Sequence, residues 1–254
     1  MIQHLLQLIW NQRKQNAWLW AELLLVSVFL WFLVDYLYVM GRTYTAPLGF
    51  DIRHTYSIVI SSLSERSPDY IPKEKRERPD GVHLLTALDR IRTYPGVESA
   101  CLTDGGMPYY MGSRNLVWRI DTLQVPCRYA FVTPEFFDVF RIYDKDGKTA
   151  SLKRAIEDNN SIVISADVET MNPGLSLLGQ KAYRGNVTDE IEETIRGISV
   201  PIRRHEYTKA EPNVYRALRL SRMEEGYYEY VSVRMSIMLI SPHASARIWP
   251  NSFG

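Results

Sequence analysis

The longest apolar stretch of the chain lies near its start, at residues 18–40, and contains only two charged side chains, Glu22 and Asp35. An α-helix rises about 1.5 Å per residue, so this stretch would extend over about 34 Å and cross the roughly 30 Å hydrocarbon layer of a membrane. The last apolar run, at residues 231–240, is shorter and is interrupted by Arg234. The pattern therefore predicts one transmembrane helix, at residues 17–40, and an outer domain at residues 41–254.

The flanks of this helix predict its orientation. Arg13 and Lys14 precede the helix while only Arg42 follows it closely, so the positive-inside tendency places residues 1–16 in the cytoplasm. A cleaved signal peptide is the alternative, because residues 23–34 form a short uncharged run behind basic residues. No small-x-small cleavage site follows that run, which favours a retained anchor. The side chains expected to hold the helix in the bilayer are Trp18, Trp20, Leu24, Phe29, Trp31, Leu33 and Tyr36.

The residues before the helix have an amphipathic pattern. Ile2, Leu5, Leu6 and Ile9 recur at helical spacing, with polar side chains between them. This spacing predicts a short helix lying on the cytoplasmic face of the membrane within residues 1–16. An unstructured terminus is the alternative.

The outer domain has short alternating stretches of apolar and polar residues, which are typical of half-buried strands. One helix is expected at residues 81–93, where Leu84, Leu85, Leu88 and Ile91 form an apolar stripe. A second helix is expected after Thr133, Pro134 and Glu135, where a hydroxyl cap precedes proline. The expected strands are at residues 55–63, 97–103, 116–121, 125–132, 161–165, 180–185, 194–200 and 229–240. This mixture predicts an α+β fold in which early and late strands pair around a central insertion.

Composition excludes several classes of function. The 30 basic and 29 acidic residues nearly cancel, so nothing indicates binding to nucleic acid. The five histidines are scattered, and neither a metal-ligand spacing nor a nucleotide-binding Gly-rich loop occurs, so we expect no metal, no cofactor and no catalytic residue. Cys101 and Cys127 fall in segments that read as neighbouring strands. A disulfide between them, or two buried thiols, would both fit that placement.

One stretch resembles a known family. Residues 129–142 read Tyr-Ala-Phe-Val-Thr-Pro-Glu-Phe-Phe-Asp-Val-Phe-Arg-Ile, similar to the "vtpeFFdvfgi" pattern in the periplasmic core domain of MacB-like permeases, of the FtsX/MacB class of ABC transporters. Arg141 stands where that family usually has glycine. Residues 94–99 are similar to the family's "PGVes" segment, and residues 161–165 with 178–180 are similar to its "vvIse…lGk" segment. The motifs and the anchor follow one another in the family's order.

This resemblance implies a two-part periplasmic region: a ferredoxin-like α+β lobe and a mostly β inserted lobe. It implies a bacterial inner-membrane protein that works as a non-catalytic component of an ABC-type export or mechanotransmission system. Its partners would be a separate ABC ATPase and further permease copies, as a dimer in the complete transporter. Such permeases normally continue into three more membrane helices, so we expect either a truncated permease or a reduced single-anchor relative. A single-pass periplasmic sensor and an anchored periplasmic hydrolase are the alternatives.

Overall fold

The structure is a computed structural model, and it describes residues 10, 17–58, 64–72, 75–110, 112, 114–158, 160–184, 191–220 and 236–241. The chain divides into two units, Met1–Pro47 and Leu48–Gly254. Each unit is described by itself below.

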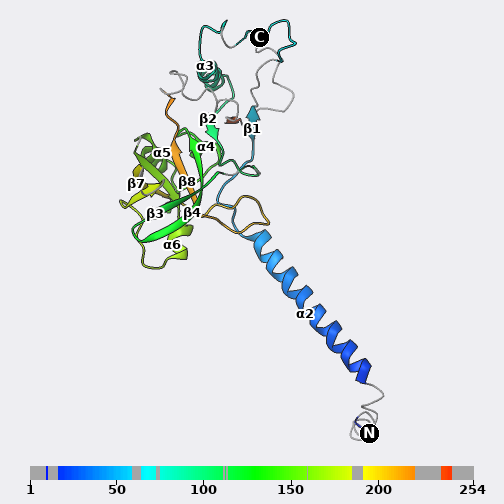
Figure 1. Cartoon of the computed structure of the whole chain (residues 1–254). Helices are drawn as coiled ribbons and strands as arrows, with labels where there is room; N and C mark the ends of the chain where they lie inside the picture. Colours follow the sequence, from blue (N-terminus) through cyan, green and yellow to red (C-terminus); the bar gives the residue numbers. More distant parts are fainter. Residues whose placement is uncertain are drawn as a thin grey trace. The chain divides into compact units, whose positions relative to one another are not determined.

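The first unit contains a single long helix, α2, at Ala17–Thr45 (Figure 1). None of its side chains is buried. The helix ends at Thr45 and so continues past the end that was expected at residue 40. Among the described residues it is the only helix that is long and apolar enough to cross a membrane. Apart from Trp10, the segment predicted to lie on the cytoplasmic face lies outside the described residues.

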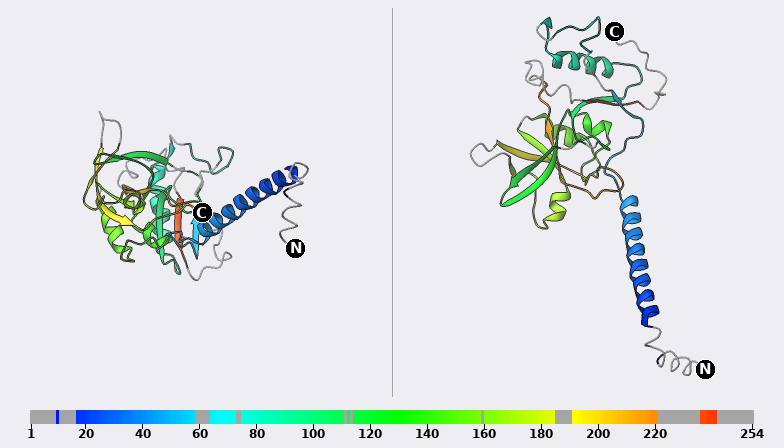
Figure 2. Two further views of the ribbon diagram at one scale, coloured as in Figure 1. Left: turned by 90° about the horizontal axis from the view of Figure 1, so that it is seen from below. Right: turned by 45° about the vertical axis from the view of Figure 1, so that its right-hand side comes forward.

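The second unit is α+β, as expected, and its described strands belong to one mixed sheet (Figures 1 and 2). The elements are β1 Thr55–Ile58, α3 Asp80–Arg92, β2 Ser99–Asp104, β3 Arg114–Ile120, β4 Leu123–Val132, α4 Phe136–Val139, α5 Ala150–Glu157, β5 Ser161–Ser165, α6 Asp167–Met171, β6 Lys181–Arg184, β7 Ile191–Ser199, β8 Asn213–Ala217 and β9 Ser236–Ile240.

The order of the strands divides this unit into two parts. Strands β4, β3, β6, β7, β5 and β8 follow one another, and β8 pairs back onto β4, so these strands form a closed ring. Strands β1, β9 and β2 extend the sheet from β4, and α3 packs on β2. Thr55 of β1 lies opposite Ile240 of β9, which confirms that early and late strands pair around a central insertion.

The hydrophobic clusters follow the same division. Leu84, Leu88 and Ile91 of α3 are buried against Leu102 and Leu239 of the sheet, which confirms the predicted stripe. A second cluster fills the ring around Trp118. A third cluster, around α4, draws side chains from β2 and β9 as well as from β4, β5 and β8, so it joins the two parts.

Three elements and one cap differ from the sequence prediction. Helices α5 and α6 and strand β8 were not predicted, and each is short, at eight residues or fewer. Helix α4 begins at Phe136 without a side-chain cap, because the hydroxyl of Thr133 accepts a hydrogen bond from the Leu102 N–H instead (3.2 Å). Of the strand predicted at residues 229–240, only β9 falls within the described residues.

The disulfide considered for Cys101 and Cys127 is not formed, and both thiols are free and buried. The register explains why. The pairing of β2 with β4 involves only the end of β4, where Thr103 lies opposite Val132. Cys127 lies earlier in β4 and faces Leu116 of β3. The two thiols consequently belong to different hydrophobic clusters.

Candidate functional site

The anchoring side chains expected from the sequence all lie on α2, and all are exposed. Trp18 is 69% exposed, Phe29 63% and Trp31 70%. Trp20, Leu24, Leu33 and Tyr36 are also exposed. Water disfavours apolar surface by about 25 cal/mol per Å², so a helix with this surface requires an apolar surrounding. A lipid bilayer provides one, and the helix satisfies its own backbone hydrogen bonds within it.

The second unit, Leu48–Gly254, is called the outer unit below after its predicted position outside the membrane, and it begins with a segment that is bonded to the rest of the unit at several points. We call residues 48–55 the junction segment. The Leu48 carbonyl accepts a hydrogen bond from the Arg203 N–H at 3.0 Å. The Asp51 N–H donates to the Phe140 carbonyl at 2.9 Å, and the Thr55 hydroxyl donates to the Val139 carbonyl at 3.4 Å. The segment is therefore tied to the end of α4 and to the loop between β7 and β8.

Gly49 permits a close approach of the junction segment to Pro201 in the loop between β7 and β8. It has φ of +82°, and a Cβ atom at this position would lie 2.1 Å from the Pro201 carbonyl oxygen. Only glycine fits both the left-handed backbone and that distance. Gly49 lies outside every predicted strand and helix, so this contact could not be predicted from the sequence.

A small charged cluster at the junction segment consists of Asp51, Arg53 and Arg141. The Asp51 carboxylate accepts hydrogen bonds from the Arg53 guanidinium, with Nε at 2.8 Å from Oδ2. The Arg141 Nη1 atom lies 3.5 Å from Asp51 Oδ1 and donates to the Arg53 carbonyl at 3.1 Å. The hydrogen bonds from Arg53 hold the pKa of Asp51 below its usual value, and the charge of Arg141 acts in the same direction.

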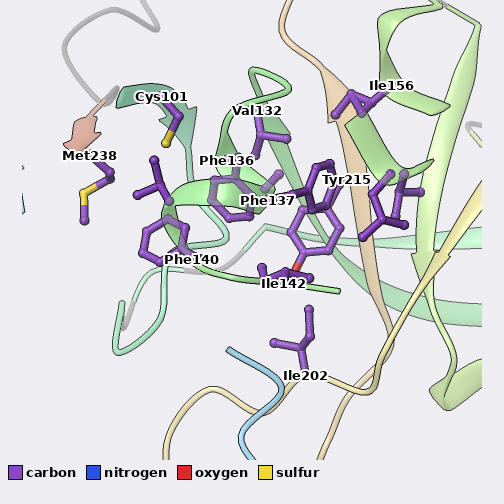
Figure 3. Close-up of a cluster of buried hydrophobic side chains, with 14 of the residues drawn as sticks. Cys101, Val132, Phe136, Phe137, Phe140, Ile142, Ile156, Ile202, Tyr215 and Met238 are labelled. Atoms are coloured by element: carbon purple, nitrogen blue, oxygen red, sulfur yellow. The ribbon is translucent and has the colours of Figure 1, made fainter. Parts of the chain in front are cut away.

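The motif at residues 129–142 comprises the end of β4, helix α4 and Arg141, which belongs to this charged cluster. Strand β4 runs into α4, whose rings Phe136 and Phe137 are buried against Tyr215 of β8, at centroid distances of 5.4 and 5.6 Å (Figure 3). The Phe140 ring is tilted against the Phe136 ring, with the two centroids 4.8 Å apart. Phe140, whose carbonyl accepts the hydrogen bond from the Asp51 N–H, is therefore part of the hydrophobic cluster around α4.

Two further sets of charged contacts lie within the outer unit. Arg92, in the last turn of α3, donates to the Glu135 carboxylate next to α4 at 2.8 Å. In the ring, the carboxylate of Glu193 is 2% exposed and is hydrogen bonded by Arg216, with Arg184 Nε at 3.5 Å. Truncation of one partner in the buried Glu193–Arg216 pair would leave an uncompensated charge, so this pair holds β7 and β8 in place relative to each other.

The described part of the chain contains no group of three or more His, Cys, Asp or Glu side chains placed to hold a metal ion. Asp167 is its most buried titratable carboxylate outside an ion pair, and burial raises its pKa while Ser165 donates a hydrogen bond to it. The absence of a catalytic residue and of a cofactor stays a prediction. The hydrogen bonds of Arg203 and Phe140 described above connect the junction segment with the loop between β7 and β8 and with the core around α4.

No protein-family model matches the chain, and no curated protein matches it. Among solved structures, it is similar to a domain described as that of a permease protein from Porphyromonas gingivalis, with 19% identity and a TM-score of 0.44. That alignment covers 63% of this chain and 62% of the other, so the chain spans less than two thirds of that relative.

The chain is also similar to the periplasmic region of MacB from Actinobacillus actinomycetemcomitans, with 9% identity, a TM-score of 0.45, and coverage of 81% of this chain and 82% of the other. The extracellular domain of the noncanonic ABC-type transporter YknZ from Gram-positive bacteria has 11% identity and a TM-score of 0.45, with coverage of 75% and 84%.

Proposed function

We propose that this chain is a non-catalytic, membrane-anchored permease component of an ABC-type export or mechanotransmission system. In this proposal α2 crosses the bacterial inner membrane with residues 1–16 in the cytoplasm, and the outer unit works in the periplasm. A separate ABC ATPase supplies the energy, and a further permease copy completes a dimer.

The exposed apolar surface of α2, directly before a folded outer unit in the chain, carries this proposal. A lone helix satisfies its own backbone in lipid but cannot line a path for a substrate. It can transmit movement along its axis, because the hydrogen bonds of a helix resist extension. Displacement is therefore the output that one helix supports.

The junction segment gives that displacement a route into the outer unit. Its bonds to Arg203 and Phe140 reach the loop between β7 and β8 and the end of α4. Helix α4 is the centre of the cluster that joins the two parts of the outer unit. A pull on residue 48 would therefore act on both parts at once.

The ATPase is assigned to another subunit for a reason that lies in the sequence. The chain has no Gly-x-x-x-x-Gly-Lys-Ser/Thr loop, which is the loop that holds nucleotide phosphates in ABC ATPases. The resemblance of residues 129–142 to MacB-like permeases supports an ABC ATPase as the source of energy.

The test separates assembly from coupling. Ala46 and Pro47 are replaced by a flexible Gly-Ser linker, and a control carries the same linker inserted at the turn of Asp146 and Gly147. Both proteins are crosslinked in membranes and purified, and hydrogen exchange of the outer unit is measured with and without ATP. We expect an ABC ATPase to copurify with both, and an ATP-dependent change in exchange only in the control and the wild type.

Three results would contradict the proposal. Recovery of the wild-type protein in the soluble fraction would remove the anchor. If no ATPase copurified and the outer unit bound a small ligand, the sensor would be favoured instead. Protection of residues 48–254 from protease added to spheroplasts would reverse the orientation.

A further inference from the structure

Two neighbouring loops of the outer unit carry exposed tyrosines. Tyr109 and Tyr110, in the loop after β2, are 42% and 41% exposed, and Tyr207, in the loop between β7 and β8, is 59% exposed. The Tyr109 N–H donates to the Arg204 carbonyl at 3.1 Å, and its hydroxyl donates to the Glu206 carboxylate. These bonds join the two loops into what we call the tyrosine surface: Tyr109, Tyr110 and Tyr207.

This surface is held in a defined shape. Arg203 donates from Nε to the Thr208 carbonyl at 2.7 Å, which closes the loop that carries Tyr207. Tyr109 has φ of +60°, a left-handed conformation that is unusual for a bulky residue. Strained backbone that the surroundings hold in place is typical of functional positions, because folding alone would favour a relaxed residue there.

The tyrosine surface adjoins the junction segment. The rings of Phe50 and Tyr109 meet edge to face, with centroids 5.9 Å apart. Arg204, whose carbonyl accepts the Tyr109 N–H, follows Arg203 in the chain. The Arg203 N–H donates to the Leu48 carbonyl. The surface therefore starts beside the first residues of the outer unit.

The chain limits how far Leu48 can lie from a bilayer that contains α2. This step rests on the proposed function, in which α2 is the anchor. Residues 41–45 continue the helix past the predicted span for about 8 Å, and three more residues reach about 10 Å at full extension. The headgroup layer occupies about 5–8 Å outside the hydrocarbon. Leu48 thus lies within about 13 Å of the headgroups, whatever the arrangement of the two units.

Tyrosine is suited to that environment. Its ring is apolar and its hydroxyl is polar, and such side chains are enriched where hydrocarbon meets headgroups. Charges of both signs lie near the surface: Arg53 and Arg141 are paired with Asp51, and Arg204 is paired with Glu211. The surface therefore fits a lipid headgroup layer by its rings, and it does not require anionic lipid.

We propose that the tyrosine surface rests on the headgroups of the outer leaflet and so fixes the orientation of the outer unit to the membrane. Movement of the anchor would then tilt the outer unit about this contact.

The test uses the full chain in vesicles of zwitterionic lipid. The native Cys101 and Cys127 are buried, so a thiol-reactive fluorophore labels an introduced cysteine selectively. Tyr207→Cys reports on the tyrosine surface. His83→Cys is the control, because His83 is exposed on α3, at the other end of the outer unit from the loop between β7 and β8 (Figures 1 and 2). The quencher is a nitroxide on the lipid headgroup.

We expect quenching at position 207 to exceed that at position 83 by at least about twofold, because interfacial side chains sit at the depth of the headgroups. High salt should leave that ratio unchanged. Tyr109→Ser in the Tyr207→Cys protein should reduce it, and Tyr109→Phe, which keeps the ring, should retain it.

The outcomes distinguish this inference from the function on which it rests. Failure of the protein to float with the vesicles would defeat the anchor and with it the proposed function. Flotation with equal quenching at positions 207 and 83 would overturn the tyrosine contact alone. A ratio that collapses in high salt or appears only with anionic lipid would replace ring insertion with electrostatic binding, which is also a refutation.

Discussion

Asp51 and Arg141 form an ion pair across the junction segment, with Arg141 Nη1 3.5 Å from Asp51 Oδ1, and Arg141 makes this contact from a left-handed backbone. Its φ is +50°, at the position where MacB-like permeases usually have glycine. The side chain thus compensates for a conformation that glycine adopts without strain, by binding Asp51 and the Arg53 carbonyl.

Substitutions at position 141 should separate the backbone strain from the side-chain contacts. Arg141→Ala loses the contacts and keeps the strain, whereas Arg141→Gly loses the contacts and the strain. We expect the glycine variant to be the more stable of the two by about 1 kcal/mol in free energy of unfolding, measured by denaturant titration in detergent. Equal stability of the two variants would argue against the left-handed backbone.

The charge of Asp51 should make stability depend on pH. Its folded pKa is lowered, so its contribution is present above the unfolded pKa of about 3.9 and is lost as the pH falls through the folded pKa. Asp51→Asn should therefore unfold at lower denaturant than the wild type at pH 7, and the difference should shrink below about pH 4. A difference that is the same at pH 3 and pH 7 would mean that the carboxylate charge is irrelevant.

Gly49 and Gly174 form a matched pair for testing the close approach at the junction segment. Both have positive φ, but a Cβ at Gly49 would meet the Pro201 carbonyl, whereas nothing lies within 4 Å of one at Gly174. Gly174→Ala should cost about 1 kcal/mol of stability through the backbone alone. Gly49→Ala should cost about 2–4 kcal/mol, because the loop must also move. Thermal unfolding of both variants measures the difference.

The two cysteines should be unreactive in the folded protein. Burial raises the pKa of the Cys127 thiol to about 12 and also raises that of Cys101, so neither forms the thiolate that reacts. We expect maleimide to modify neither thiol in the native protein and both after denaturation, as read by mass spectrometry. Recovery of an intramolecular disulfide under mild oxidation would contradict the register of β2 on β4.

Local pattern predicted many of the elements. The helix at α3 and its buried stripe followed from apolar residues at helical spacing, and β2 to β5 from short runs of β-branched and aromatic residues. Helices α5 and α6 and strand β8 are shorter than the windows in which such periodicity is distinctive. Thr133 had the residue type of a cap, but its hydroxyl had a competing donor in Leu102, which lies on another strand.

The candidate site was less accessible to sequence reading. No sequence motif includes Gly49, Asp51 or Arg203. The only indication in the sequence was Arg141, which stands where the resembled family usually has glycine. Their roles come from contacts between residues separated by most of the chain, such as Arg203 with Leu48. Nothing local marks either partner of such a contact.

Sequence alone determined that an apolar helix precedes an α+β unit, because hydrophobic periodicity is a property of neighbouring residues. Tertiary structure alone decided that β8 closes the ring onto β4, that Cys101 and Cys127 face different clusters, and that Arg141 reaches Asp51. Those outcomes depend on strand register and on the fit of side chains from distant segments. The free energy that selects them arises only when the whole core is assembled.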